Sequence, residues 1–252
     1  FLSLIKSLAS EQDFDKLLEL ITRETMTVSG AEAAFTYIVA ENSNELEPKT
    51  LECVRIKEFD RNLLQALPKF SLEGDTPLAK VLSEGKGRIL SLQSIGGYDN
   101  LTDALQLQSA QAYAEPLINR QGDSIGILCL VYGDGDSINT EKQQGRLAFI
   151  QALSGFAAVT LESRKMLKMQ KDLLDSFIRL LAGAIDSKSP YTGGHCQRVP
   201  VLTELLARKA CESTEDVFAD YGLTDEQWEA IKIASWLHDC GKVTTPEFVV
   251  DK

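Results

Sequence analysis

The feature that most limits how this chain can fold is a helical pattern of more than thirty residues, over 140–177. Globular helices average about 11–12 residues, so a helix of this length usually connects two parts of a protein. The total of 252 residues also suffices for two domains. We therefore expect one domain before this helix and a second one after it.

Apolar residues of the same helix follow the spacing of a coiled-coil seam. Their separations of 7, 3, 4 and 7 residues match the a and d positions of a heptad, although Glu162 and Ser176 interrupt the pattern. The seam residues are Val159, Met166, Met169, Leu173 and Leu180. A parallel homodimer through this helix is therefore predicted. Four basic residues in the same stretch favour a solvated outer face over an anion or nucleic-acid contact; they are Arg164, Lys165, Lys168 and Lys171.

The residues before the long helix predict an α+β domain. Apolar residues there switch between helical spacing and the alternation typical of strands, with Gly, Asn and Asp at the breaks. The predicted elements are a helix over 12–29, strands over 35–39 and 50–56 separated by a polar loop, a short helix ending at Gly85, a strand over 88–92, and a hairpin turning over 119–123. We expect these strands to form an antiparallel sheet with flanking helices.

The residues after the long helix predict helices only. A turn over 187–194 precedes a helix from His195, and Thr224 and Gln227 occupy the capping-box positions of another helix that ends at His238. The second domain is therefore expected to be all-α.

Charge and cysteine usage exclude several classes of function. The 37 acidic side chains outnumber the 26 basic ones, and a net charge of -11 repels nucleic acids and anionic membranes. The five cysteines contain no CxxC pair, which is typical of reduced cytosolic thiols. No apolar stretch reaches the roughly 18–20 residues of a spanning helix. We predict a cytoplasmic protein that binds neither nucleic acid nor membrane, cut from a longer chain because it opens on Phe1.

The first part of the chain resembles a GAF domain, a small-molecule-binding or dimerising α+β sensor module. The resemblance covers about residues 10–163 and rests on the order of elements around GDTPLAKVLSEGKGRIL and AEPLINRQGDSIGILCLVYGDGD. We assign residues 1–163 to this sensor domain and residues 164–180 to a connecting signalling helix.

The ligand of this GAF-like domain is not identified by the sequence. Haem held by histidine is excluded because no histidine precedes His195, and a bilin thioether is disfavoured because neither Cys53 nor Cys129 has a histidine neighbour. Both cysteines lie on strand-like segments, where core packing is the favoured role. A ligand sensor and an empty, dimerising domain both remain open.

The chain contains only two histidines, His195 and His238, and the second is followed directly by Asp239. Imidazole nitrogen binds borderline transition metals, and an adjacent carboxylate can bridge two of them. Two such ions can activate a water and neutralise a phosphate under attack, and Lys242 can place a further cation on that phosphate. Alone, the His-Asp pair also fits a capping or packing role at a helix end.

The context of the pair resembles the HD-GYP subfamily of the HD-superfamily phosphohydrolases, which hydrolyse cyclic dinucleotides, chiefly cyclic di-GMP. The segments that carry the resemblance are AIDSKSPYTGGHCQRV and LHDCGKVTTPEFVVDK, and we assign residues 181–252 to the N-terminal portion of such a domain. The resemblance implies metal ligands at His195, His238 and Asp239 for two divalent ions, Fe or Mn. It also implies catalytic roles for Asp239 and for Lys242, which would contact the substrate phosphate.

The sequence departs from this family in two ways. Some members carry Glu four residues before the first histidine, as a ligand to a third metal; Tyr191 stands there and favours a two-metal site. The remaining family ligands and the Gly-Tyr-Pro signature lie downstream of the His-Asp pair and are absent, so the site of this chain is expected to be incomplete and the chain inactive by itself.

Three other features have simple structural interpretations. The GDGD run at 133–136 lacks the ligand spacing of a calcium loop and favours a hairpin turn. Gly193 and Gly194 favour a tight turn over a phosphate nest, and Cys196 and Cys240 favour packing over metal ligation.

The parent protein is therefore expected to be a GAF-regulated, metal-dependent phosphodiesterase with a cyclic dinucleotide as substrate. It is expected to dimerise through its GAF domain and connecting helix. Two alternatives remain open: a sensor and dimerisation module with a non-catalytic HD segment, and an HD-type hydrolase of another nucleotide.

Overall fold

The computed structural model describes residues 2–40, 44–54, 61–133, 141–186 and 194–246. They divide into two compact units, Phe1–Met166 and Leu167–Lys252. The boundary lies inside helix α7 (Glu141–Asp186), which confirms the predicted long helix and extends it. The segments 134–136, from the GDGD run, and 187–193, with Tyr191, lie outside the described residues.

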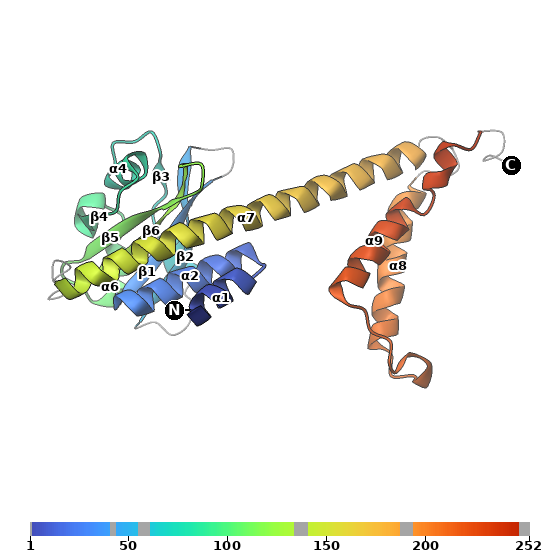
Figure 1. Cartoon of the computed structure of the whole chain (residues 1–252), viewed down its shortest axis with the longest axis horizontal. Helices are drawn as coiled ribbons and strands as arrows, with labels where there is room; N and C mark the ends of the chain where they lie inside the picture. The colour runs from blue at the N-terminus through green and yellow to red at the C-terminus, as the bar shows by residue number, and fades with distance from the viewer. Residues whose placement is uncertain (1, 41–43, 55–60, 134–140, 187–193, 247–252) are drawn as a thin grey trace. The chain divides into compact units, whose positions relative to one another are not determined.

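The first unit contains a six-stranded antiparallel sheet in the order β3-β2-β1-β6-β5-β4 (Figure 1). The strands are β1 (Ala33–Val39), β2 (Glu45–Cys53), β3 (Phe70–Ser71), β4 (Arg88–Ser91), β5 (Gln111–Ile118) and β6 (Ser124–Tyr132). The helices of this unit before α7 are α1 (Leu2–Ser10), α2 (Phe14–Ser29), α3 (Arg61–Gln65), α4 (Pro77–Glu84), α5 (Leu92–Ile95) and α6 (Asp99–Leu105).

Each face of the sheet is covered by helices, because successive strand residues point to opposite faces. On β1, Phe35 and Tyr37 enter a core that includes buried leucines of α3, α4, α5 and α6. Ala34 enters a second core with residues of α1, α2 and the first part of α7. Cys129 is buried in the first core and Cys53 packs at its edge, as predicted.

Local signals explain where the predicted helices begin and end. Asp13 accepts a hydrogen bond from the Lys16 backbone N–H at the start of α2, and Gly30 ends this helix in the left-handed conformation with φ 72°. Thr76 caps α4 in the same way, and Gly85 ends it. These helices match their predicted positions.

Two strand boundaries differ from the prediction. The predicted polar loop before the second strand is partly strand, because β2 pairs with β1 as far as Leu46 and buries that side chain. The strand predicted over 88–92 ends at Ser91, since the buried Leu92 already begins α5.

The described residues of the second unit form helices and connecting turns, without a strand. It consists of the end of α7, α8 (His195–Glu212), the 3-10 turn η1 (Asp216–Phe218), α9 (Asp225–Leu237) and the 3-10 turn η2 (Cys240–Val243). The predicted fold class, an α+β domain, a long helix and an all-α part, is confirmed. Among the described helices, none is long and apolar enough to cross a membrane.

Candidate metal centre

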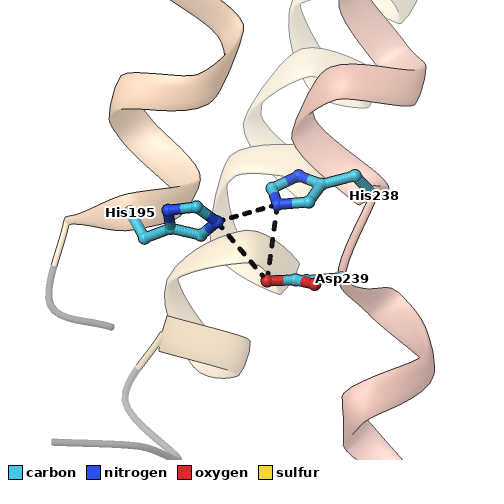
Figure 2. A group of neighbouring side chains, drawn as sticks. All are labelled: His195, His238 and Asp239. Atoms are coloured by element: carbon cyan, nitrogen blue, oxygen red, sulfur yellow. Dashed lines mark hydrogen bonds and ion pairs between the residues drawn. The ribbon is translucent and has the colours of Figure 1, made fainter. Parts of the chain in front are cut away.

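Three side chains from two helix ends converge in the second unit (Figure 2). His195 is the first residue of α8, while His238 and Asp239 follow the last residue of α9. The Nε2 atoms of the two histidines are 3.1 Å apart. Asp239 Oδ2 lies 3.7 Å from the His195 Nε2 and 3.4 Å from the His238 Nε2.

These separations fit a shared metal ion. Imidazole nitrogen and carboxylate oxygen bind such ions at about 2.0–2.2 Å, so two donors to one ion lie at most about 4.4 Å apart. All three measured distances fall below this limit. Two imidazoles and a carboxylate are also a donor set that suits Fe, Mn or Zn. The residues present therefore fit a divalent metal.

The position of His195 depends on the turn that precedes α8. Gly194 occupies the N-cap position with φ 73°, a left-handed conformation that favours glycine. The helix therefore begins at His195, and the next side chain, Cys196, is buried against Ala182 and Ile185 of α7. The imidazole itself retains 40% of its exposure, so it is open to an ion from solvent.

The position of His238 depends on both ends of α9. The predicted capping box is present, with Thr224 and Gln227 each bonded to the other's backbone N–H. At the other end, His238 Nδ1 lies 2.7 Å from the carbonyl oxygen of Ser235. Because a carbonyl oxygen only accepts, Nδ1 donates, and the Nε2 of the neutral ring keeps its lone pair for a cation.

Lys242 provides a positive charge beside the carboxylate. The turn η2 brings its Nζ to 2.5 Å from Asp239 Oδ2, the oxygen that also faces both histidines. Burial acts to raise the pKa of Asp239, but the hydrogen bond from Lys242 and the nearby positive groups outweigh it and lower this pKa. The carboxylate is therefore held in the ionised form that binds a metal.

The two neighbouring cysteines are not part of the cluster of possible ligands. Burial, together with a hydrogen bond to Asp186, raises the pKa of the Cys196 thiol to about 11. A thiol in this state is a poor ligand, since metals bind the thiolate. Cys240 is exposed.

The chain is similar to curated phosphodiesterases and to solved GAF-domain structures. No family model matches the chain. It is 32% identical over 108 residues to 3'3'-cGAMP-specific phosphodiesterase 3 of Vibrio cholerae serotype O1. The aligned region covers 40% of this chain and 21% of that protein. It is also 25% identical over 150 residues to 3'3'-cGAMP-specific phosphodiesterase 2 of the same organism. The aligned region covers 60% of this chain and 26% of that protein.

The predicted resemblance to cyclic dinucleotide phosphodiesterases is confirmed. The chain spans about a quarter or less of the length of these curated relatives. Among solved structures, it is similar to the GAF domain/HD domain protein from Geobacter sulfurreducens, with a TM-score of 0.48 and 14% identity over 64% of this chain and 98% of that one. It is also similar to the A. aeolicus nlh2 GAF domain, with a TM-score of 0.47 and 16% identity over 64% of this chain and 93% of that one.

The structure brings together all four residues that the sequence singled out for chemistry; they are His195, His238, Asp239 and Lys242. Two supporting residues were not predicted. Ser235 orients His238 through its backbone carbonyl, which no sequence signal marks. Asp186 accepts a hydrogen bond from the Cys196 backbone N–H. The sequence does contain a signal for such a contact, because the glycine before His195 gives the helix no capping side chain of its own.

Proposed function

We propose that this chain is the sensor and the first part of the catalytic region of a metal-dependent phosphodiesterase that hydrolyses a cyclic dinucleotide. The observation that carries the proposal is the convergence of His195, His238 and Asp239 on one point, within the limit for a shared ion. The named activity of the curated relatives supports the same class of substrate. Because the chain covers only part of those relatives, the proposal concerns the natural-length protein.

Each residue of the cluster has a distinct task. His195 and His238 would hold the ion through Nε2, and Asp239 would hold it through Oδ2, because these three atoms face one another. Divalent ions held there, Fe or Mn, would supply Lewis-acid chemistry that activates water and neutralises charge on the phosphodiester. Ser235 keeps the proton of His238 on Nδ1, so this ring stays correctly oriented for the ion.

Lys242 contacts Asp239 and is also placed to contact the substrate. Its ammonium group pairs with Asp239 in this structure, and an incoming phosphate offers a second negative partner at the same place. We propose that Lys242 binds a non-bridging phosphate oxygen and stabilises the negative charge that develops there during attack. Its flexible stem lets it contact both groups.

Two cyclic dinucleotides are candidates for the substrate. The family resemblance of the sequence predicts cyclic di-GMP, whereas the curated relatives are named for 3'3'-cGAMP. The decisive assay incubates the natural-length protein, loaded with Mn²⁺ or Fe²⁺, with each compound and follows the linear product by chromatography. Linearisation that is lost in His238→Gln supports the proposal. No linearisation of either compound refutes it and favours a hydrolase of another nucleotide or a non-catalytic module.

We also propose that the protein is a homodimer whose α7 helices pair and transmit the state of the GAF-like unit. Four of the five predicted seam residues are exposed in the single chain: Met166 at 56%, Met169 at 59%, Leu173 at 72% and Leu180 at 69%. Large apolar side chains at heptad spacing gain free energy when a second helix covers them. The exposed stripe therefore supports a second copy of this chain as the partner of α7.

A further inference from the structure

The first turn of α8 needs a partner from elsewhere in the chain. Backbone N–H groups at a helix start have no partner within the helix, and a Ser, Thr, Asp or Asn at the N-cap usually accepts one of them. Here the N-cap is Gly194, which has no side chain and makes no such bond. The helix that presents His195 is therefore not capped by its own N-cap residue.

Asp186, the last residue of α7, takes this role. Its Oδ1 and Oδ2 atoms lie 3.3 and 3.2 Å from the backbone nitrogen of Cys196, the residue after His195. A carboxylate also interacts favourably with the positive end of the helix dipole. The side chain of Asp186 thus fixes the start of α8 from the end of α7.

Apolar contacts strengthen the same junction. Ala182 and Ile185 from the last turns of α7 pack with Cys196, and Trp236 of α9 packs against this small core. Cys196 follows one ligand position directly, and Trp236 precedes the other histidine by two residues. The last two turns of α7 therefore share one small core with the residue that follows His195 and with a residue of α9 close to His238.

We propose that Asp186 is a positioning residue of the metal centre: by capping α8 from the end of α7, it holds His195 within reach of the ion shared with His238. This inference rests on the proposed metal site. It also couples α7 to that site, because any movement of the helix end shifts the carboxylate that fixes His195. Asp186 itself is not one of the clustered ligands.

The test combines Mn²⁺ binding with the spectrum of the two imidazoles in the 252-residue chain. Mn²⁺ affinity is measured from the paramagnetic resonance of the free ion. We expect Asp186→Ala to weaken it by about tenfold, as for other residues that orient metal ligands. Asp186→Asn keeps an oxygen acceptor and is expected to fall between this variant and the wild type. Asp172→Ala removes an exposed carboxylate from the same helix and is expected to change the affinity by less than about twofold.

The imidazole spectrum separates positioning from metal binding. Because the chain has only two histidines, histidine labelled with ¹⁵N gives two ring systems, which His195→Gln and His238→Gln assign. In the absence of metal, Asp186→Ala is expected to shift or broaden the His195 ring signals, and Asp172→Ala is not. Circular dichroism checks that the helices remain, and Asp186→Asn carries the test if the alanine variant unfolds.

The outcomes discriminate between the two proposals. If the wild type binds no Mn²⁺ but Asp186→Ala changes the His195 signals, the positioning role stands and the metal function fails. If the wild type binds Mn²⁺ and Asp186→Ala changes neither affinity nor ring signals, the positioning role is overturned and the metal function stands.

Discussion

The Nε2 atom of His195 lies 3.1 Å from the Nε2 atom of His238, although 43 residues separate them in sequence. His238 donates through Nδ1 to the Ser235 carbonyl, so in the neutral ring its Nε2 offers a lone pair to this contact. Two ring nitrogens that face each other in this way can share a proton or a cation. With Asp239 Oδ2 beside them, the arrangement favours a divalent cation.

Lys242 is expected to affect metal affinity and catalysis in opposite directions. Lys242→Met removes a positive charge next to Asp239 Oδ2, so Mn²⁺ is expected to bind about threefold tighter or more. The natural-length enzyme is expected to lose about 100-fold in kcat, because the developing phosphate charge loses a partner. Lys209→Met removes an exposed lysine of α8 and serves as the control. A variant in which affinity and kcat both stay unchanged would show that Lys242 has neither role.

A buried threonine cluster is expected to contribute measurably to the first unit. Thr22 of α2 donates to the Leu18 carbonyl and lies 2.8 and 2.7 Å from the hydroxyls of Thr36 and Thr50. Thr22→Val leaves two buried hydroxyls without this partner, at a cost of about 1–3 kcal/mol. Thr27→Val, on the exposed side of the same helix, is expected to cost less than about 0.5 kcal/mol. Hydrogen exchange of the β1 and β2 amides measures both losses of stability. Equal losses in the two variants would show that the buried threonine cluster does not contribute.

Glu115 is expected to make the stability of the first unit depend on pH. Burial raises the pKa of this carboxyl, although hydrogen bonds from Tyr113 and Gln151 oppose the change. The folded state therefore binds the proton more tightly than the unfolded state. The stability from this group is full below the usual pKa of 4.5 and is lost as pH rises through the higher folded pKa.

Glu115→Gln is expected to flatten this dependence, since the amide oxygen still accepts from Tyr113 but does not titrate. The free energy of opening of the β5 and β6 amides, measured by hydrogen exchange from pH 4.5 upward, tests the sign. Glu45→Gln, at an exposed site on β2, is the control. A wild type that gains stability with rising pH relative to Glu115→Gln would contradict the assignment.

The seam of α7 is expected to control dimerisation. Leu173→Glu combined with Leu180→Glu places charges at positions that are 72% and 69% exposed in the single chain, so the helix survives but its pairing does not. Leu174→Glu, which is 49% exposed and lies off the seam, is expected to leave the dimer intact. Sedimentation velocity measures the difference. Equal masses for the two variants would exclude the seam as the interface.

Helix ends with local signals were predictable from the sequence. The capping box of Thr224 and Gln227 and the glycine at position 30 act on residues within one turn, so their effect is visible in a short window. Helix α6 lacks such signals: its N-cap, Tyr98, makes no side-chain capping bond to the first turn, and the helix ends at the non-glycine Gln106 in the left-handed conformation. Burial of Leu101 and Leu105 stabilises α6, and burial depends on the rest of the fold.

The residues of the candidate site were predictable from the sequence, but the contacts that position them were not. The motifs around His195 and His238 predict metal-binding chemistry, because few residue types bind transition metals. The contact from Asp186 depends on α7 ending beside the start of α8, a tertiary arrangement that spacing alone does not reveal. The same holds for the junction of Ala182, Ile185 and Cys196.

Mn²⁺ titration of the chain and of its three ligand variants shows whether His195, His238 and Asp239 share a metal ion. We expect saturable Mn²⁺ binding by the wild type that His195→Gln, His238→Gln and Asp239→Asn each weaken by at least about tenfold, because each removes one of three donors to a shared ion. Glu212→Gln, an exposed carboxylate at the far end of α8, is expected to bind like the wild type. Equal Mn²⁺ affinity in the wild type and all three ligand variants would contradict the assignment of this cluster as a metal centre.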